Sequence, residues 1–206
     1  MKYTGPKFKL ARREGVNLFG VPKYDIRKRR KLPGQHWGTM PRLSEYWKLL
    51  RNKQLLKRSY LMSEKQFRTL IMQKAWKFAK NKDVAFDEAV KIFLERRLDV
   101  TLVRAGLAKT IMQARQMVGH GHVLLNWRKH NIPSYLIKKG DVVEVREKLK
   151  TSPLYAQAPI LTSNFKPVSW LNVDKQKLTI EIIDLPKSEE IKLPADVLKV
   201  IEFYAR

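Results

Sequence analysis

The chain has 206 residues, no cysteine, and a formal net charge of +24 that arises from 43 Lys and Arg against 19 Asp and Glu. The lack of cysteine excludes disulfides, thiolate metal sites and a cysteine nucleophile. The sequence also contains no stretch of about 18 apolar residues, the length needed to span a bilayer. A hydrophobic content of 44% is too high for a disordered basic tail. Since the first residues also lack the apolar stretch of a secretory signal, we expect a soluble, intracellular protein that attracts polyanions.

The positive charge is unevenly distributed along the chain. Residues 1–60 hold 17 basic and 3 acidic residues, and residues 100–150 hold 10 and 3, whereas residues 151–206 hold 7 of each. Charge that served only solubility would be spread evenly, so this distribution predicts two adjacent anion-binding surfaces.

Residues 1–42 form a basic arm with little periodicity. The arm carries Arg12 and Arg13, the basic run 27–31, and turn formers such as Pro33 and Gly34. Such a segment cannot bury much apolar surface by itself, so we expect it to order against its partner. The alternative is a flexible, solvated tail, which the apolar residues of the arm disfavour.

Residues 43–94 predict a helical domain. An apolar stripe that includes Tyr46 and Trp47 alternates with basic residues over positions 41–60, which is typical of a basic amphipathic helix. Such a helix can lie along a phosphate backbone or on a membrane surface. Ser63 and Gln66 have capping-box spacing and predict the start of another helix.

Residues 95–147 form the core of a predicted compact module. Leu94, Leu98 and Leu102 recur every four residues and therefore predict one shared helix face, which Gly106 would end. Thr110 to Gln113 has capping-box spacing and predicts a second helix. We expect short strands over 122–126 and 142–146, and two further strands over 170–173 and 178–183.

Several motifs in a fixed order resemble the family of bacterial small-subunit ribosomal protein four. In the module they are Arg97-Leu-Asp99, Arg104-Ala-Gly-Leu-Ala108, Ala114-Arg-Gln116, His120-Gly-His-Val123, Ile132-Pro-Ser-Tyr135 and Gly140-Asp141. Further matching segments are Tyr3-Thr-Gly-Pro6, Pro33-Gly-Gln-His36, Leu43-Ser-Glu-Tyr46 and Glu64-Lys-Gln-Phe67. Residues 200–204 are similar to the strand-like segment that closes the family's chain.

The resemblance implies an α+β fold in which an RNA-binding module, two helices on a small and mostly antiparallel sheet, is inserted into a helical domain. The implied division is a basic, irregular arm over 1–42, a helical domain over 43–94 rejoined by 187–206, and an RNA-binding domain over 95–186 with its core at 95–147. It also implies a structural protein of the small ribosomal subunit that clamps a multi-helix junction in the 5′ domain of the ribosomal RNA during assembly. Implied neighbours are small-subunit proteins three and five and messenger RNA near its entry path, with an influence on translational accuracy.

We expect basic and polar side chains of the arm, the first helix and the module to bind this RNA. They are Arg12, Arg13, Arg27, Lys28, Arg29, Arg30, Lys31, Gln35, His36, Arg42, Lys53, Lys57, Arg58, Arg104, Lys109, Thr110, Arg115, His120, His122 and Asn126. Lys109→Ala combined with Arg115→Ala should weaken RNA binding and leave thermal stability nearly unchanged.

Enzymatic alternatives are weaker. The segment Arg97-Leu-Asp99 resembles a motif of pseudouridine synthases, but the residues after position 150 are too few for their catalytic domain, so Asp99 is better explained as a salt-bridge partner. His120 and His122 do not predict a zinc site, because no cysteine accompanies them. We expect no catalytic residue, no metal and no cofactor. The open alternatives are a membrane-surface protein and a non-ribosomal RNA-handling or RNA-modifying factor that uses the same module, either pseudouridine-synthase-like or a stalled-ribosome binder.

Two positions depart from the family pattern. The family has a glycine after His36 and after Asn126, whereas this chain has Trp37 and Trp127. Tryptophan is poorly suited to the positive φ of a two-residue hairpin turn. We therefore expect a longer turn over residues 126–130 and a reshaped loop over 34–37.

Overall fold

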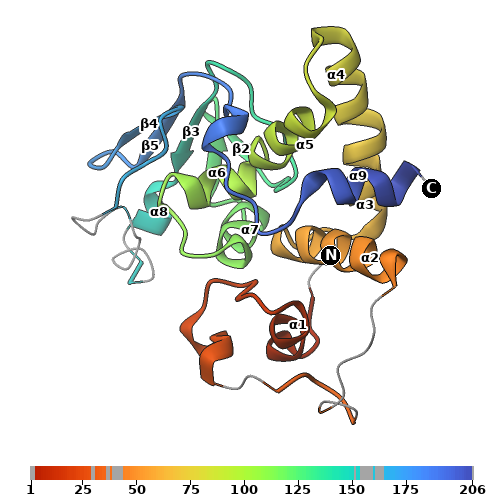
Figure 1. Cartoon of the computed structure of the whole chain (residues 1–206). Helices are drawn as coiled ribbons and strands as arrows, with labels where there is room; N and C mark the ends of the chain where they lie inside the picture. Colours follow the sequence, from red (N-terminus) through yellow and green to blue (C-terminus); the bar gives the residue numbers. More distant parts are fainter. Residues whose placement is uncertain are drawn as a thin grey trace. The chain divides into compact units, whose positions relative to one another are not determined.

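The structure, a computed structural model, describes residues 3–28, 31–35, 38, 44–150, 152–153, 160 and 165–205 (Figure 1). The chain divides into two compact units, one formed by Met1–Lys91 with Lys192–Arg206 and the other by Ile92–Ile191. The units thus part near, but not at, the domain boundaries predicted at 94–95 and 186–187. The functional division into arm, helical domain and RNA-binding domain stays a prediction.

The arm contains more regular structure than the sequence predicts. Helix α1 spans Lys7–Glu14 and ends at Gly15, which adopts a φ of 71°. Two short 3-10 turns follow at Pro22–Tyr24 and Ile26–Lys28. Phe19 is buried and its ring centre lies 5.7 Å from that of Tyr24. The described part of the arm therefore has a small apolar cluster of its own.

The other helices of the first unit follow the predicted starts closely. Helix α2 begins after Ser44, whose side chain accepts a hydrogen bond from the backbone of Trp47. The capping box of Ser63 and Gln66 is present and opens α3, which confirms that prediction. The bounds are α2 Glu45–Ser59, α3 Glu64–Thr69, a π-helical stretch Leu70–Ala75, α4 Trp76–Lys82, α5 Phe86–Glu95, which continues into the second unit, and α9 Val197–Ala205.

The end of the chain is a helix and not the strand-like segment predicted over 200–204. Helix α9 lies along α2 (Figure 1). Val197 and Val200 are buried, and the ring of Phe203 lies 5.7 Å from that of Tyr46. These contacts recur with a helical spacing, so packing against α2 selects the helix.

The second unit places two helices against a five-stranded antiparallel sheet with the strand order β2-β1-β3-β5-β4. This arrangement confirms the predicted α+β class and the predicted strands. The bounds are α6 Leu98–Arg104, α7 Ile111–Gly119, β1 Val123–Leu125, β2 Arg128–His130, β3 Val142–Val145, α8 Glu147–Lys150, β4 Leu171–Asp174, β5 Thr179–Ile182 and a 3-10 turn Ser188–Glu190.

One face of this sheet forms the core of the second unit. Alternate strand residues such as Val123, Val145 and Ile180 are fully buried and share a hydrophobic cluster with Leu102 of α6 and Val118 of α7. Because strand side chains alternate between faces, the residues between them point to the opposite, outer face.

The predicted continuous helix through Leu94, Leu98 and Leu102 is wrong. Helix α5 ends at Glu95 and α6 begins at Leu98, because Arg97 adopts an extended conformation with φ −73° and ψ 136°. Arg97 forms an isolated antiparallel bridge with Leu136, and the backbone N–H of Leu98 donates to the Tyr135 carbonyl over 2.9 Å. The distant segment 133–137 thus supplies hydrogen bonds that a continuous helix would have made internally.

The expected longer turn after β1 is also wrong. Leu125 pairs directly with Arg128, so only Asn126 and Trp127 form the turn. Their φ values are 48° and 62°, the positive values of a two-residue hairpin turn. The Trp127 side chain is 76% exposed. The corresponding expectation for Trp37 concerns a residue outside those the structure describes.

Candidate nucleic-acid interface

Four of the predicted RNA contacts, Arg29, Arg30, His36 and Arg42, lie outside the described residues, as does the side chain of Lys28. In the described part of the arm, Arg13, Arg27, Lys31 and Gln35 are exposed. Arg27 lies 3.4 Å from Asp25 but keeps 87% of its side chain exposed. Their exposure makes these side chains accessible to an anionic partner.

Arg12 is tied into the arm. Its Nε donates to the carbonyl of Lys31 over 2.8 Å, and its guanidinium lies 5.6 Å from the ring centre of Phe8. With both contacts in place Arg12 is half-buried.

The predicted contacts on α2 are engaged in ion pairs within the first unit. Lys53 is 7% exposed, its Nζ lies 3.0 Å from Glu64 and it sits 4.2 Å from the ring centre of Phe203. Lys57 lies 2.7 Å from the other oxygen of Glu64, and Tyr204 donates its hydroxyl to Glu64 over 2.8 Å. These contacts fasten α9 and α3 to α2, and they bury the ammonium group of Lys53.

This cluster changes the acidity of Glu64. Burial alone raises the pKa of Glu64, but the hydrogen bonds from Lys57, Lys53 and Tyr204 outweigh burial and lower the pKa to about 2. Burial, and then the bond to Glu64, raise the pKa of Tyr204. Glu64 is therefore ionised at neutral pH.

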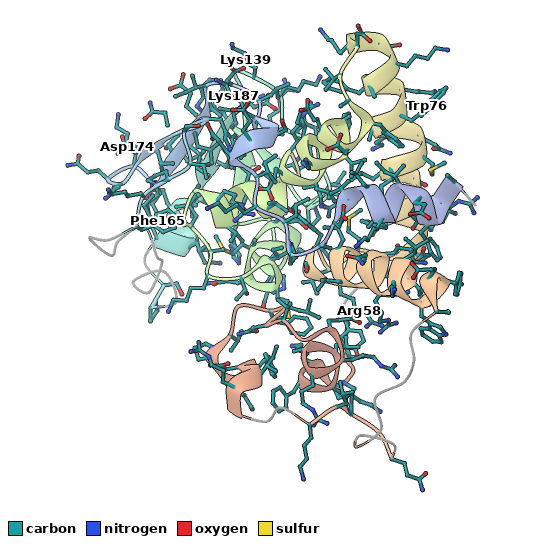
Figure 2. The ribbon with its side chains drawn as sticks, in the orientation of Figure 1. Arg58, Trp76, Lys139, Phe165, Asp174 and Lys187 are labelled. Atoms are coloured by element: carbon teal, nitrogen blue, oxygen red, sulfur yellow. The ribbon has the colours of Figure 1, made fainter. Side chains whose placement is uncertain are left out.

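Arg58 joins α2 to the arm. It points from α2 (Figure 2) and donates, together with Arg51, to Glu14 at the end of α1. The Glu14 side chain is only 2% exposed, and Arg51 lies 3.1 Å from it. A buried carboxylate held by two guanidiniums is a strong tether between these two helices.

In the second unit, Asp99 is the centre of a buried charge network. Asp99 is fully buried and accepts two hydrogen bonds from Arg97, over 3.0 and 2.9 Å. Arg115 donates its Nε to Asp99 over 2.6 Å, and its side chain is 18% exposed. Both Asp99 oxygens are thus engaged by cations, as expected for a salt-bridge partner, and Arg115 ties α7 to the start of α6.

Arg104 and the start of α7 combine internal contacts with exposure. Arg104 forms a bidentate pair with Glu95 over 2.7 and 2.9 Å and keeps 40% of its side chain exposed. Thr110 caps α7 by accepting from the Gln113 backbone, but Gln113 accepts from the backbone of Lys109 and not from that of Thr110. The predicted capping box is therefore shifted by one residue, and the Lys109 side chain is exposed.

Asn126 has a structural role in the turn after β1. Its Nδ2 donates to Asp141 over 3.0 Å, and its Oδ1 accepts from the Val142 backbone over 2.9 Å. Since both ends of the amide are bonded inside the protein, Asn126 holds the hairpin against the start of β3.

His120 and His122 lie beside basic residues that the sequence-based prediction omitted. Their ring centres are 5.9 Å apart. Burial, and then the charges of His120, Arg146, Lys148 and Lys129, lower the pKa of His122. The signal that could have identified Lys129 and Arg146 is the strand register, because both fall on the same sheet face as His122.

The described residues show neither a candidate metal site nor a candidate membrane-spanning helix. Within the described ranges, no group of three or more His, Asp or Glu side chains is arranged to hold a metal ion. Among the same residues, no helix is both long and apolar enough to cross a membrane.

Comparison with known proteins covers the whole chain. A family model described as the ribosomal protein S4/S9 N-terminal domain matches residues 2–95, and one described as the S4 domain matches residues 96–143. The small ribosomal subunit protein uS4 of Kosmotoga olearia is 38% identical over 211 residues, with 100% of this chain and 99% of the relative covered. Proteins of the same name from Geobacillus thermodenitrificans and Leuconostoc mesenteroides are each 39% identical to this chain. The match to the Geobacillus protein covers 100% of this chain and 99% of the relative. The match to the Leuconostoc protein covers 98% of this chain and 97% of the relative.

Proposed function

This chain belongs to the uS4 family of small ribosomal subunit proteins, and from that premise we propose that it binds small-subunit ribosomal RNA directly and clamps a multi-helix junction of the 5′ domain during assembly. The proposal includes a place in the cytoplasmic small subunit beside proteins three and five. It further includes a position near the messenger entry path and an influence on translational accuracy. Non-catalytic binding is the whole of the proposed activity.

The observation that carries the proposal is the excess of exposed basic side chains on the second unit. Over residues 100–150 the chain holds 10 basic and 3 acidic residues, and most of the basic side chains are exposed. The exposed members are Lys109, Arg128, Lys129, Lys138, Lys139, Arg146 and Lys148. Asp141, one of the three acids, is buried and bonded to Asn126.

Phosphate neutralisation explains how such a surface would act. Helices that converge at an RNA junction repel one another through their phosphates, and Lys and Arg relieve that repulsion while releasing counterions. Side chains cannot read the narrow major groove of A-form RNA, so recognition would depend on the junction's shape and its 2′-hydroxyls.

The structure narrows the set of RNA contacts that we propose. In the described part of the arm, Arg13, Arg27, Lys31 and Gln35 are exposed, and in the module Lys109 and His120 are exposed. Lys53, Arg115 and Asn126 instead hold the protein together, so we propose that they support the interface without contacting RNA.

Binding to the isolated 5′-domain junction tests this function. The full chain should prefer the junction over a length-matched unrelated duplex by on the order of a hundredfold at physiological salt. Equal affinity for both RNAs, lost in parallel as salt rises, would identify the chain as a non-specific polycation and overturn the proposal.

A further inference from the structure

The strand register gathers three basic side chains at one end of the outer sheet face. Leu124 of β1 lies opposite Lys129 of β2 and Glu144 of β3. The backbone N–H of Arg146 donates to the carbonyl of His122 over 2.9 Å, which continues the β1–β3 pairing by one step. Because Val123 and Val145 are fully buried on the inner face, their neighbours His122 and Arg146 fall on the outer face with Lys129.

Two helices bring further basic groups to the same place. His120 lies at the end of α7, with its ring centre 5.9 Å from that of His122. Lys148, in α8, acts on His122 as a nearby positive charge. We call His120, His122, Lys129, Arg146 and Lys148 the histidine cluster.

The Lys129 and Arg146 side chains both lie against Gly121. Arg146 donates its Nη1 to the Gly121 carbonyl over 3.3 Å. A methyl group at Gly121 would collide with Cε of Lys129, so the Lys129 side chain lies directly over this glycine. Gly121 also has a φ of 69°, a conformation that glycine adopts most easily.

The carboxylates near the histidine cluster are directed elsewhere. Among the described residues, Lys129 and Arg146 form no ion pair with a carboxylate. Glu144, an acidic residue on the same sheet face, lies 3.5 Å from Lys150, and Glu147 lies 2.8 Å from the same ammonium group. Among the described residues, the exposed charges of Lys129 and Arg146 are therefore not neutralised by a paired carboxylate.

Gathering like charges in this way costs free energy unless an anion joins them. His122 responds to that cost, since burial and the surrounding cations favour its neutral form. An anion placed among the five side chains would reverse the electrostatic part of this effect and favour the protonated ring, which donates from both nitrogens.

We propose that the histidine cluster binds one backbone phosphate of the ribosomal RNA, and that filling this site draws a proton from solvent onto His122. The inference rests on the proposed function, because it assigns one contact within that RNA interface. Its consequence is that RNA affinity rises as the pH falls through the range in which histidine titrates.

The first experiment measures binding of the full chain to the junction RNA at about pH 6 and about pH 8, at constant ionic strength. Wild-type protein should bind roughly threefold to tenfold more tightly at the lower pH, since each unit of pKa shift corresponds to a factor of ten. His122→Gln should lose this pH dependence while binding with nearly wild-type affinity at the higher pH. A His122→Gln protein with the full wild-type pH dependence would overturn the inference.

A salt series supplies the matched control. Lys129→Ala should reduce the slope of log affinity against log salt by about one, as expected when one phosphate contact is lost. Lys187, labelled in Figure 2, is an exposed residue outside the basic stretch 100–150 and directly precedes the 3-10 turn Ser188–Glu190. Lys187→Ala should leave the slope unchanged, and equal slopes in both variants would contradict the assignment.

Proton NMR of the histidine rings separates this inference from the proposed function. Inorganic phosphate, added without RNA and compared with chloride at equal ionic strength, should raise the pKa of His122. A rise supports the phosphate site even where the junction RNA is not preferred, in which case only the proposed function fails. An unchanged pKa overturns the site even where the junction RNA is preferred.

Discussion

Arg115 donates from its Nε to the carboxylate of Asp99 over 2.6 Å, and Asp99 is fully buried. This contact connects the middle of α7 to the first turn of α6. The expectation that Arg115 could be replaced without loss of stability is therefore revised, because removing one partner leaves a buried charge less well compensated.

Arg115→Ala should lower the free energy of unfolding by about 2 kcal/mol, less than for an isolated buried pair because Arg97 still holds Asp99. Urea denaturation measures this change. Gln116→Ala is the matched control, since Gln116 is the neighbouring and exposed residue of the same helix, and its stability should stay within about 0.5 kcal/mol of wild type. Equal stability of the two variants would refute a structural role for Arg115.

Trp127→Gly should stabilise the protein by about 1 kcal/mol. Trp127 has a φ of 62° and a side chain that is 76% exposed, so glycine would relieve backbone strain and remove little packing. The melting temperature measures the gain. Asn126→Gly, in the same turn, should instead destabilise, because the Asn126 amide bonds both Asp141 and Val142; the same sign for both variants would contradict this account.

The sequence predicted the elements that depend on local patterns and missed those that depend on distant contacts. The helix starts at Ser63 and Thr110 and the strand alternation around Val143 depend on residues close in sequence, so local patterns identified them. The helix break at Arg97 depends on backbone partners near residue 135. Local patterns favoured an uninterrupted helix there, because the competing hydrogen bonds come from a distant segment.

The candidate RNA-binding site likewise combines features that composition predicts with features that distant contacts decide. The excess of basic residues was evident from composition, but which of them are exposed depends on distant acids. Lys53 is buried because Glu64 and Phe203 meet it from two other helices. The outer-face grouping of His122, Lys129 and Arg146 requires the strand register, which the expected longer turn after Asn126 would have changed.

Glu64 should make stability depend on pH in the acid range. Its pKa of about 2 lies below the ordinary value of 4.5, so its contribution is fully present above about pH 4.5 and is lost as the pH falls toward 2. Since 45% of the side chain is exposed, screening should hold the contribution to about 1 kcal/mol. Glu64→Gln should be less stable than the wild type at neutral pH, and the difference in their free energies of unfolding should shrink as the pH falls. Denaturation at several pH values measures this difference. A difference that is constant with pH would show that Glu64 contributes by packing alone.

Glu14 should hold the arm in place before any RNA binds. Its carboxylate is 2% exposed and is shared by Arg51 and Arg58 of α2. Glu14→Ala would leave these two guanidiniums to repel each other, so α1 should detach more often and trypsin should cleave after Arg12 and Arg13 faster than in the wild type. Lys9→Ala serves as the control, since Lys9 is an exposed residue of the same helix and its loss leaves the Glu14 contacts intact. Cleavage at the wild-type rate in the Glu14 variant would mean that the apolar contacts of Ala11 and Phe19 suffice to hold the arm.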